Sequence, residues 1–207
     1  TYDAYGRRTS KGNITYSYDS DGYLYSQSNQ ITFKRDHNGQ IIGINHNGNS
    51  YVLRRNAQGD VIALLDINGS VVVKYVYDAW GNHKVCSSTG AEISDTTHVG
   101  HINPIRYRGY YYDTETQLFY CNSRYYSPEL CRWISPDSIE YLDTESINGL
   151  NLYAYCGNDP INYADPSGHA PEWLQGLAIG LAIVGAVLVI GAVTVLTCGV
   201  GTLAGTM

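Results

Sequence analysis

Short runs of alternating apolar and polar residues occupy the first part of the chain. Ile14-Thr15-Tyr16-Ser17-Tyr18 is one example, and Val71-Val72-Val73-Lys74-Tyr75-Val76-Tyr77 is another. A period of two places the apolar side chains on one face of a β-strand. Because glycine-containing turns separate these runs, the pattern predicts a ladder of antiparallel hairpins over residues 1–82.

A short repeat marks the predicted turns. The pattern aromatic-Asp-x-x-Gly occurs at residues 2–6, 18–22 and 77–81, and degenerate copies occur at 35–39, 55–59 and 65–69. The Asp or Asn side chain accepts backbone N–H groups two residues on, and the glycine supplies a left-handed backbone. Each hairpin then buries its aromatic face by stacking on its neighbours. We therefore expect these glycines at turns: Gly6, Gly22, Gly39, Gly69 and Gly81.

Composition supports a mainly β fold and excludes two other classes. The chain has 20 Tyr against 2 Phe, and its 22 Gly suit many tight turns. Charged residues make up only 15%, which excludes a disordered polyelectrolyte. All 13 Lys and Arg lie at or before Arg132, so the acidic remainder offers no basic patch for phosphates. We therefore expect no nucleic-acid partner.

Cysteine and histidine give no sign of a metal or a disulfide framework. The five cysteines are odd in number and form no Cys-x-x-Cys pair, so reduced thiols and no cofactor are expected. Residues 83–103 are polar and predict a long loop or a weak hairpin, in which we expect His98 and His101 to be exposed. The chain begins inside a repeat and without a signal peptide, which indicates a piece of a longer protein.

A long apolar stretch lies near the C-terminus. Leu177 to Val200 contain no charge and no proline, which predicts one continuous helix of about 36 Å at ~1.5 Å per residue. That length suits a membrane span with some tilt, and residues 176–180 and 201–205 have the small-xxx-small spacing of close helix pairs in lipid. A linker helix packed inside the protein, or the front of a truncated cargo, is the alternative.

The segment between these two parts has a dense order of motifs. It contains Ile105-Arg106-Tyr107-Arg108-Gly109-Tyr110, Ser123-Arg124-Tyr125-Tyr126-Ser127-Pro128, Arg132-Trp133-Ile134-Ser135-Pro136-Asp137, Asn151-Leu152-Tyr153-Ala154-Tyr155, Asn158-Asp159-Pro160 and Asp165-Pro166-Ser167-Gly168. The order resembles the Rhs repeat-associated core domain. The preceding repeats resemble the YD repeats of Rhs proteins and of the Tc toxin C component. Together the resemblance covers residues 1–168.

The resemblance implies a hollow β-shell closed by a plug that cuts its own chain. We therefore expect four parts: residues 1–82 form the wall, 83–103 a loop or weak hairpin, 104–169 the core or plug, and 170–207 an apolar helix that is either a membrane segment or the start of a truncated cargo. The resemblance implies an aspartyl autoprotease with Asp137 and Asp165 as the catalytic pair and cleavage between His169 and Ala170. We expect Arg132 to support this pair. The chain departs from the family at His169, where relatives often have Leu, Met or Trp, and at Ser138, where Asp-Pro is frequent.

Two readings of these aspartates remain open from the residues alone. Aspartyl catalysis needs two carboxylates that share one proton, so that one activates water and the other polarises the carbonyl. Yet Asp-Pro-Ser-Gly is also an ordinary turn sequence, and Ser-Pro-Asp also begins helices.

The functional hypothesis is a C-terminal fragment of a polymorphic-toxin shell that is secreted or at the cell surface. Its expected partners are its own C-terminal cargo, the missing N-terminal shell repeats and, through residues 177–200, a membrane. The alternatives are a non-catalytic adhesion module whose exposed tyrosines bind carbohydrate, and an inactive remnant of the shell.

Overall fold

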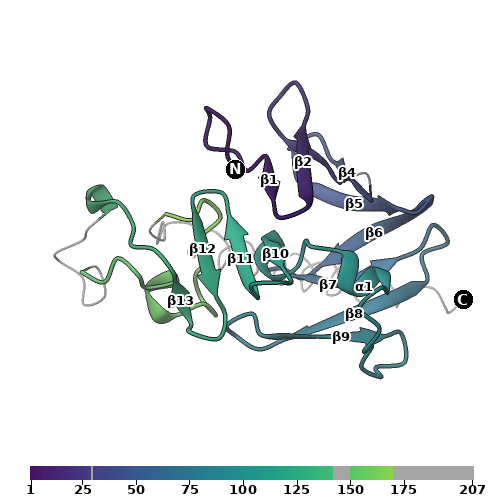
Figure 1. The fold of residues 1–207 in the computed structure, drawn as a ribbon. Coiled ribbons are helices and arrows are strands. Elements are labelled where there is room, and N and C mark those ends of the chain that lie inside the picture. The colour runs from purple at the N-terminus through teal and green to yellow at the C-terminus, as the bar shows by residue number, and fades with distance from the viewer. Residues whose placement is uncertain (29, 142–149, 170–207) are drawn as a thin grey trace, which may run out of the picture.

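The computed structural model describes residues 1–28, 30–141 and 150–169, and two antiparallel sheets dominate it (Figure 1). The first, here called the wall sheet, has nine strands in chain order: β1 (Ser10–Lys11), β2 (Ile14–Tyr18), β3 (Leu24–Gln27), β4 (Ile31–Arg35), β5 (Ile41–His46), β6 (Asn49–Arg55), β7 (Val61–Leu65), β8 (Val71–Tyr77) and β9 (His83–Ser87). The second, the plug sheet, has four: β10 (Tyr111–Asp113), β11 (Leu118–Cys121), β12 (Arg124–Ser127) and β13 (Arg132–Trp133).

Helical structure is limited to short segments in the described part of the chain. These are α1 (Val99–Ile102) and the 3-10 turns η1 (Tyr107–Gly109), η2 (Ile139–Tyr141) and η3 (Cys156–Asn158). The predicted mainly β, antiparallel fold is therefore confirmed. Among residues 1–28, 30–141 and 150–169, no helix has the length and apolar character needed to cross a bilayer. The apolar stretch 177–200 lies outside the described residues.

The predicted turns occur where the repeat places them. At Asp78, the side-chain Oδ1 accepts the backbone N–H groups of Trp80 at 2.8 Å and Asn82 at 3.0 Å. The backbone N–H of Gly81 donates a hydrogen bond to the Asp78 carbonyl oxygen, and Gly81 has a φ of 91°. The other repeats have the same arrangement, with positive φ at Gly6, Gly22, Gly39, Gly59 and Gly69. The hairpin prediction for residues 1–82 is confirmed.

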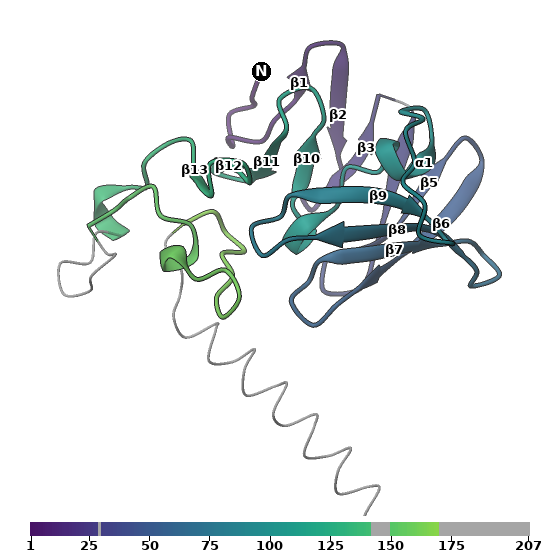
Figure 2. The same ribbon diagram turned by 90° about the horizontal axis from the view of Figure 1, so that it is seen from below.

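The wall sheet curves, and the plug sheet begins on its concave side (Figures 1 and 2). The inward faces of the strands form one core with α1 and the first plug residues. Val99, Ile105 and Tyr111 join this core from outside the wall sheet. The plug therefore completes the burial of wall side chains that the sheet alone leaves uncovered.

An Arg-Tyr-x-Gly motif fastens the plug to the wall. The Arg106 guanidinium is buried and donates to His83 Nε2 on β9 at 2.5 Å. The ring of Tyr107 packs over Gly81, and its hydroxyl donates to the Ala79 carbonyl at 2.8 Å. The backbone N–H of Arg108 donates to a carboxylate oxygen of Asp60 at 2.8 Å. Three consecutive residues thus contact three parts of the wall.

The connecting segment corrects one expectation. The wall sheet continues to Ser87, and α1 follows at Val99. His98 and His101 are half-buried rather than exposed. His98 caps the start of α1, because its Nδ1 accepts the N–H of Gly100 at 3.2 Å. His101 Nε2 lies 2.7 Å from the Ile93 carbonyl oxygen. Both rings are used for packing and hydrogen bonding within the wall, which a Gly- and Thr-rich sequence does not reveal.

Gly81 and Gly69 form a matched pair for testing how the plug rests on the wall. Both have positive φ, but a Cβ at Gly81 would lie 2.8 Å from the Tyr107 ring, whereas one at Gly69 would meet nothing within 4 Å. We expect Gly69→Ala to cost about 1 kcal/mol of local stability through backbone strain. Gly81→Ala adds overpacking of about 1–3 kcal/mol. Hydrogen exchange of the two hairpins in the full-length protein measures both changes, and equal effects would contradict the packing argument.

Candidate functional site

The structure brings Asp137 and Asp165 to the same guanidinium. Arg124 Nη2 lies 2.8 Å from Asp137 Oδ2 and 3.4 Å from Asp165 Oδ2. The three side chains are at most 5% exposed. The two aspartates predicted as a pair are 28 positions apart in the chain and are joined through one positive charge. Arg124 was not predicted to belong to this site.

Local structure fixes each of these side chains. Arg124 begins β12, and its guanidinium lies 4.3 Å from the centre of the Trp133 ring on β13. Asp137 follows β13, and its backbone N–H donates to the Leu152 carbonyl at 2.9 Å. Arg124 Nη1 donates to the same carbonyl oxygen at 3.2 Å. The Leu152 carbonyl oxygen therefore holds both the Arg124 guanidinium and the backbone of Asp137.

Asp165 stands at the start of another Asp-x-x-Gly turn. Its Oδ1 accepts the backbone N–H groups of Gly168 at 2.8 Å and His169 at 3.1 Å. Gly168 has a φ of 78°, and a Cβ there would lie 2.5 Å from the Cys121 carbonyl oxygen. The turn therefore requires glycine both for its backbone conformation and for its close approach to β11.

The Asp-x-x-Gly turn also presents a carbonyl to the site. The oxygen of Gly168 accepts hydrogen bonds from Arg124 Nε and, at 3.0 Å, from Ser123 Oγ. Arg124 thus contacts both carboxylates and the backbone one residue before the predicted cleavage site. Fixing that carbonyl fixes the direction in which the chain leaves the turn.

Burial dominates the electrostatics of the Arg124–Asp165 pair. It raises the pKa of Asp165 to about 6, and the nearby Asp137 charge adds to the rise, while Arg124 opposes it. Burial also lowers the pKa of Arg124 despite the two carboxylates beside it. Both shifts favour the uncharged form, so the ion pair compensates desolvation only in part.

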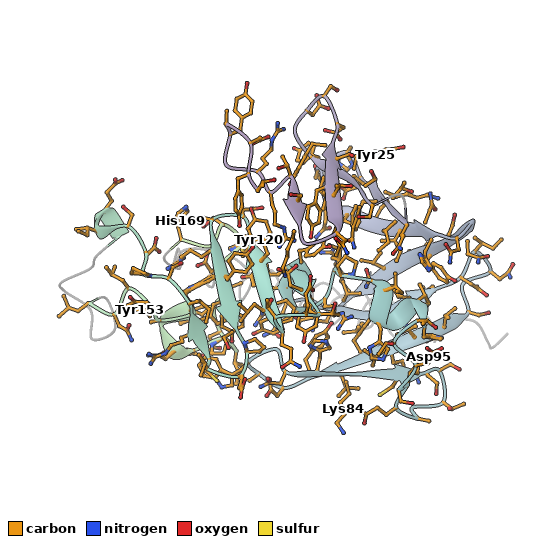
Figure 3. All side chains as sticks on the ribbon, in the orientation of Figure 1. Tyr25, Lys84, Asp95, Tyr120, Tyr153 and His169 are labelled. Carbon is orange, nitrogen blue, oxygen red and sulfur yellow. The ribbon has the colours of Figure 1, made fainter. Side chains whose placement is uncertain are left out.

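His169 reaches the other carboxylate. Its Nδ1 lies 3.0 Å from Asp137 Oδ1, and its side chain is 38% exposed. Figure 3 labels His169 among the side chains of the described residues. The structure therefore places the residue before the predicted cleavage site in direct contact with one member of the pair. Ala170, on the other side of that bond, lies outside the described residues.

Arg132 occupies a different place from the one expected for a supporting residue. It lies on β13, where its neighbour Trp133 is only 1% exposed. Successive side chains on a strand point to opposite faces, so the Arg132 side chain is exposed to solvent. No ion pair of Arg132 occurs within the described residues. Arg124 holds the position between the carboxylates that a supporting cation requires.

A cavity of about 760 Å³ opens beside the turn, between the wall and the plug. Pro166, Ser167 and His169 line it on the plug side, and Tyr18 and Arg35 are among the residues on the wall side. The segment that carries the predicted cleavage site therefore faces a space large enough to admit water.

The fold and the site define a class of protein. An antiparallel sheet built from Asp-x-x-Gly hairpins, with a second antiparallel sheet packed on its inner side, is the architecture of a YD-repeat shell. The sequence profile of the Teneurin YD-shell family matches residues 25–161. The chain belongs to this family.

Relatives and solved structures agree with the assignment. The tRNA3(Ser)-specific nuclease WapA of Bacillus spizizenii is 39% identical over 178 residues, which cover 81% of this chain and 7% of that protein. Toxin subunit YenC2 of Yersinia entomophaga is 41% identical over 34% of this chain and 7% of its own length. The crystal structure of TcdB2-TccC3-Cdc42 has a TM-score of 0.53 at 20% identity, over 82% of this chain and 10% of that one. The chain thus spans 7% of the length of these two curated relatives and 10% of the solved chain.

Arg124 and Arg132 offer a matched test of the site. Arg124→Met leaves two buried carboxylates without their cation, which should cost about 3–5 kcal/mol. Arg132→Met alters an exposed side chain and should change stability by less than about 0.5 kcal/mol. Hydrogen exchange of residues 118–133 in the full-length protein measures both. Equal protection in the two variants would contradict the role assigned to Arg124.

Proposed function

We propose that this part of the chain closes a toxin-associated shell and cuts its own backbone between His169 and Ala170. The supporting observation is the contact of Arg124 with both Asp137 and Asp165 beside the Gly168 turn. The arrangement concentrates two carboxylates, one cation and a constrained backbone segment where water can enter. Of these, two neighbouring carboxylates and access for water are what hydrolysis of a peptide bond by an aspartyl mechanism requires.

The two carboxylates differ in a way that assigns their roles. Asp165 has a pKa raised to about 6 and is the carboxyl that holds a proton in mildly acidic solution, so it is the general acid. Asp137 is the general base. Its Oδ2 lies beside Arg124, but within the described residues no donor is aligned to hydrogen-bond that oxygen. A water molecule is a suitable partner for it.

Hydrolysis then proceeds with a balanced exchange of protons. Asp137 takes a proton from water, whose oxygen attacks the His169 carbonyl carbon. Asp165 donates its proton to the nitrogen as the carbon–nitrogen bond breaks, which leaves a carboxylic acid on His169 and an amine on Ala170. The new acid then gives its proton to the amine, and the step ends with Asp137 protonated and Asp165 ionised. The Gly168 turn keeps the new carboxyl end on the plug, because its hydrogen bonds lie before the broken bond.

The released piece is, in this proposal, a toxin cargo that remains enclosed by the shell. WapA of Bacillus spizizenii is a tRNA nuclease, YenC2 of Yersinia entomophaga is a toxin subunit, and Tse5 of Pseudomonas aeruginosa is a toxin protein. By analogy the complete protein acts outside the producing cell. Membrane contact through residues 177–200 stays a prediction from sequence.

Asparagine at either aspartate tests the mechanism. Asp137→Asn and Asp165→Asn keep the side-chain shape but remove the base or the acid, so each should slow cleavage at least about a thousandfold. The double variant should add nothing further, because the pair acts as a unit. Intact-mass measurement of the full-length protein distinguishes one species from two. Single variants that still cut at the same bond would refute the assignment, and an uncut wild type with a complete shell would favour the adhesion or remnant alternatives.

The pH dependence provides a second test. Asp165 must hold its proton to act as the acid, and its protonated fraction falls as pH rises through about 6. We therefore expect the cleavage rate to fall by about tenfold for each pH unit above that value. A time course of freshly translated protein, transferred to buffers of graded pH, measures this limb. A rate that rises with pH over the same range would reverse the roles of the two carboxylates.

A further inference from the structure

The cavity between the wall and the plug is lined by cations and by no anion. Five arginines contribute to it, and none of the described residues that line it is Asp or Glu. Three of these arginines have a carboxylate partner behind the lining: Arg7 with Asp3, Arg8 with Asp113 and Arg108 with Asp60. The other two, Arg35 and Arg55, have no ion pair within residues 1–28, 30–141 and 150–169.

Arg35 and Arg55 occupy the aromatic position of the wall repeat. Residues 35–39 and 55–59 are degenerate copies in which arginine stands where residues 18–22 and 77–81 begin with tyrosine. Tyr18 and Tyr77 pack against the core on the inner side of the wall. The two degenerate repeats therefore bring guanidinium groups, in place of phenol rings, to the inner ends of β4 and β6.

Backbone carbonyls position both guanidinium groups without neutralising them. Arg35 Nη2 donates to the Leu24 carbonyl oxygen at 3.0 Å, and Arg55 Nη2 donates to the Ile41 carbonyl oxygen at 2.6 Å. Burial lowers the pKa of both arginines, since each charge is partly removed from water. A carboxylate that entered the cavity would meet two cations already held in place.

Two wall aspartates act on these arginines from beyond ion-pair distance. Asp19 favours the charged form of Arg35, and Asp36 favours that of Arg55. Both carboxylates accept backbone N–H groups of their own Asp-x-x-Gly turns, as Asp19 does from Tyr23 at 2.8 Å. They are therefore committed to the turns, and the cavity has space and charge for a carboxylate from another part of the chain.

The chain that leaves the plug carries one carboxylate within reach of this cavity. His169 lines the cavity, and the sequence 170–207, which lies outside the described residues, contains a single charged residue, Glu172. Three residues of extended chain span about 10 Å, which is comparable to the width of a space of 760 Å³. Pro171 also favours an extended backbone at the residue before it.

We propose that Arg35 and Arg55 form a carboxylate-binding site on the wall and that its occupant is Glu172. The Gly168 turn holds the chain before the bond predicted to be cut, and this site holds the chain after it. A peptide bond that is held on both sides presents its carbonyl in one orientation. The binding itself does not depend on self-cleavage, whereas its effect on the rate of cleavage rests on the proposed function.

Removal or reversal of the charge at Glu172 tests the site. Glu172→Gln loses the ion pairs, and Glu172→Arg places a cation among cations. Each should lower the hydrogen-exchange protection of the β4–β5 and β6–β7 turns about tenfold, because charge-assisted hydrogen bonds are lost. Protection of the β8–β9 turn, which does not line the cavity, should stay unchanged and establishes that each variant is folded. The measurement uses the full-length protein.

Arg54 and Arg55 provide a matched control for this experiment. They are neighbours on β6, but Arg54 is exposed and Arg55 lines the cavity. Combining Glu172→Arg with Arg55→Glu should restore the protection of the β6–β7 turn, because the two charges are exchanged. Combining Glu172→Arg with Arg54→Glu changes the net charge equally and should restore nothing.

The outcomes separate failure of this site from failure of self-cleavage. Equal protection in the wild type and in Glu172→Gln would overturn the site, and so would equal rescue by Arg54→Glu and Arg55→Glu. Intact mass of the same samples should show cleavage slowed about tenfold in Glu172→Gln, and an unchanged rate would overturn the role in cleavage. If Asp165→Asn still cuts at the same bond, the self-cleavage proposal is wrong, and the exchange data alone decide the site.

Discussion

An aspartate or asparagine side chain that gathers backbone N–H groups across a glycine turn underlies both the wall and the site. At Asp78 the turn joins two wall strands and exposes its carboxylate to solvent. At Asp165 the same spacing, with Gly168 in the left-handed region, lies beneath β11 and β12 and buries the carboxylate. Burial changes its chemistry, because the pKa of Asp165 rises to about 6. One local motif thus serves as a structural turn in one place and as a candidate catalytic group in another.

Tyrosine side chains serve two purposes in this protein, because the ring faces lie against buried arginines and the hydroxyls donate hydrogen bonds. Arg8 is 2% exposed, and its guanidinium lies 4.5–4.7 Å from the centres of three tyrosine rings. Such rings attract a cation by their faces. Tyrosine hydroxyls also donate to wall carbonyls, as Tyr126 does to Trp80 at 2.7 Å and Tyr107 to Ala79. A phenylalanine in these positions would leave the carbonyls unpaired.

The sequence predicted the wall well, because its signals are local. Alternation and the Asp-x-x-Gly spacing act within a few residues, and the hairpins formed where expected.

The site was predicted less completely. Arg132 was favoured because it lies near Asp137 in sequence, but the strand period that buries Trp133 turns Arg132 outward. Arg124 lies on β12 and contacts Asp137 and Asp165 only after the chain has folded. The spacing of these residues along the sequence does not reveal such a contact. His98 and His101 were misplaced for another reason. Their partners, Gly100 and Ile93, are close in sequence, but α1 has only four residues and leaves no periodic pattern to recognise.

The ion pair between Arg8 and Asp113 has a consequence for the order of events during synthesis. The two residues are 105 positions apart and 2.7 Å from each other, and both are buried. Translation delivers Arg8 long before Asp113, so the first hairpins emerge with a cation whose anion has not yet been made. Contacts of such high sequence separation form late and slow folding. The first hairpins therefore stay open to exchange until the plug strands emerge from the ribosome, and β10 then fixes the beginning and the end of this region in a single step.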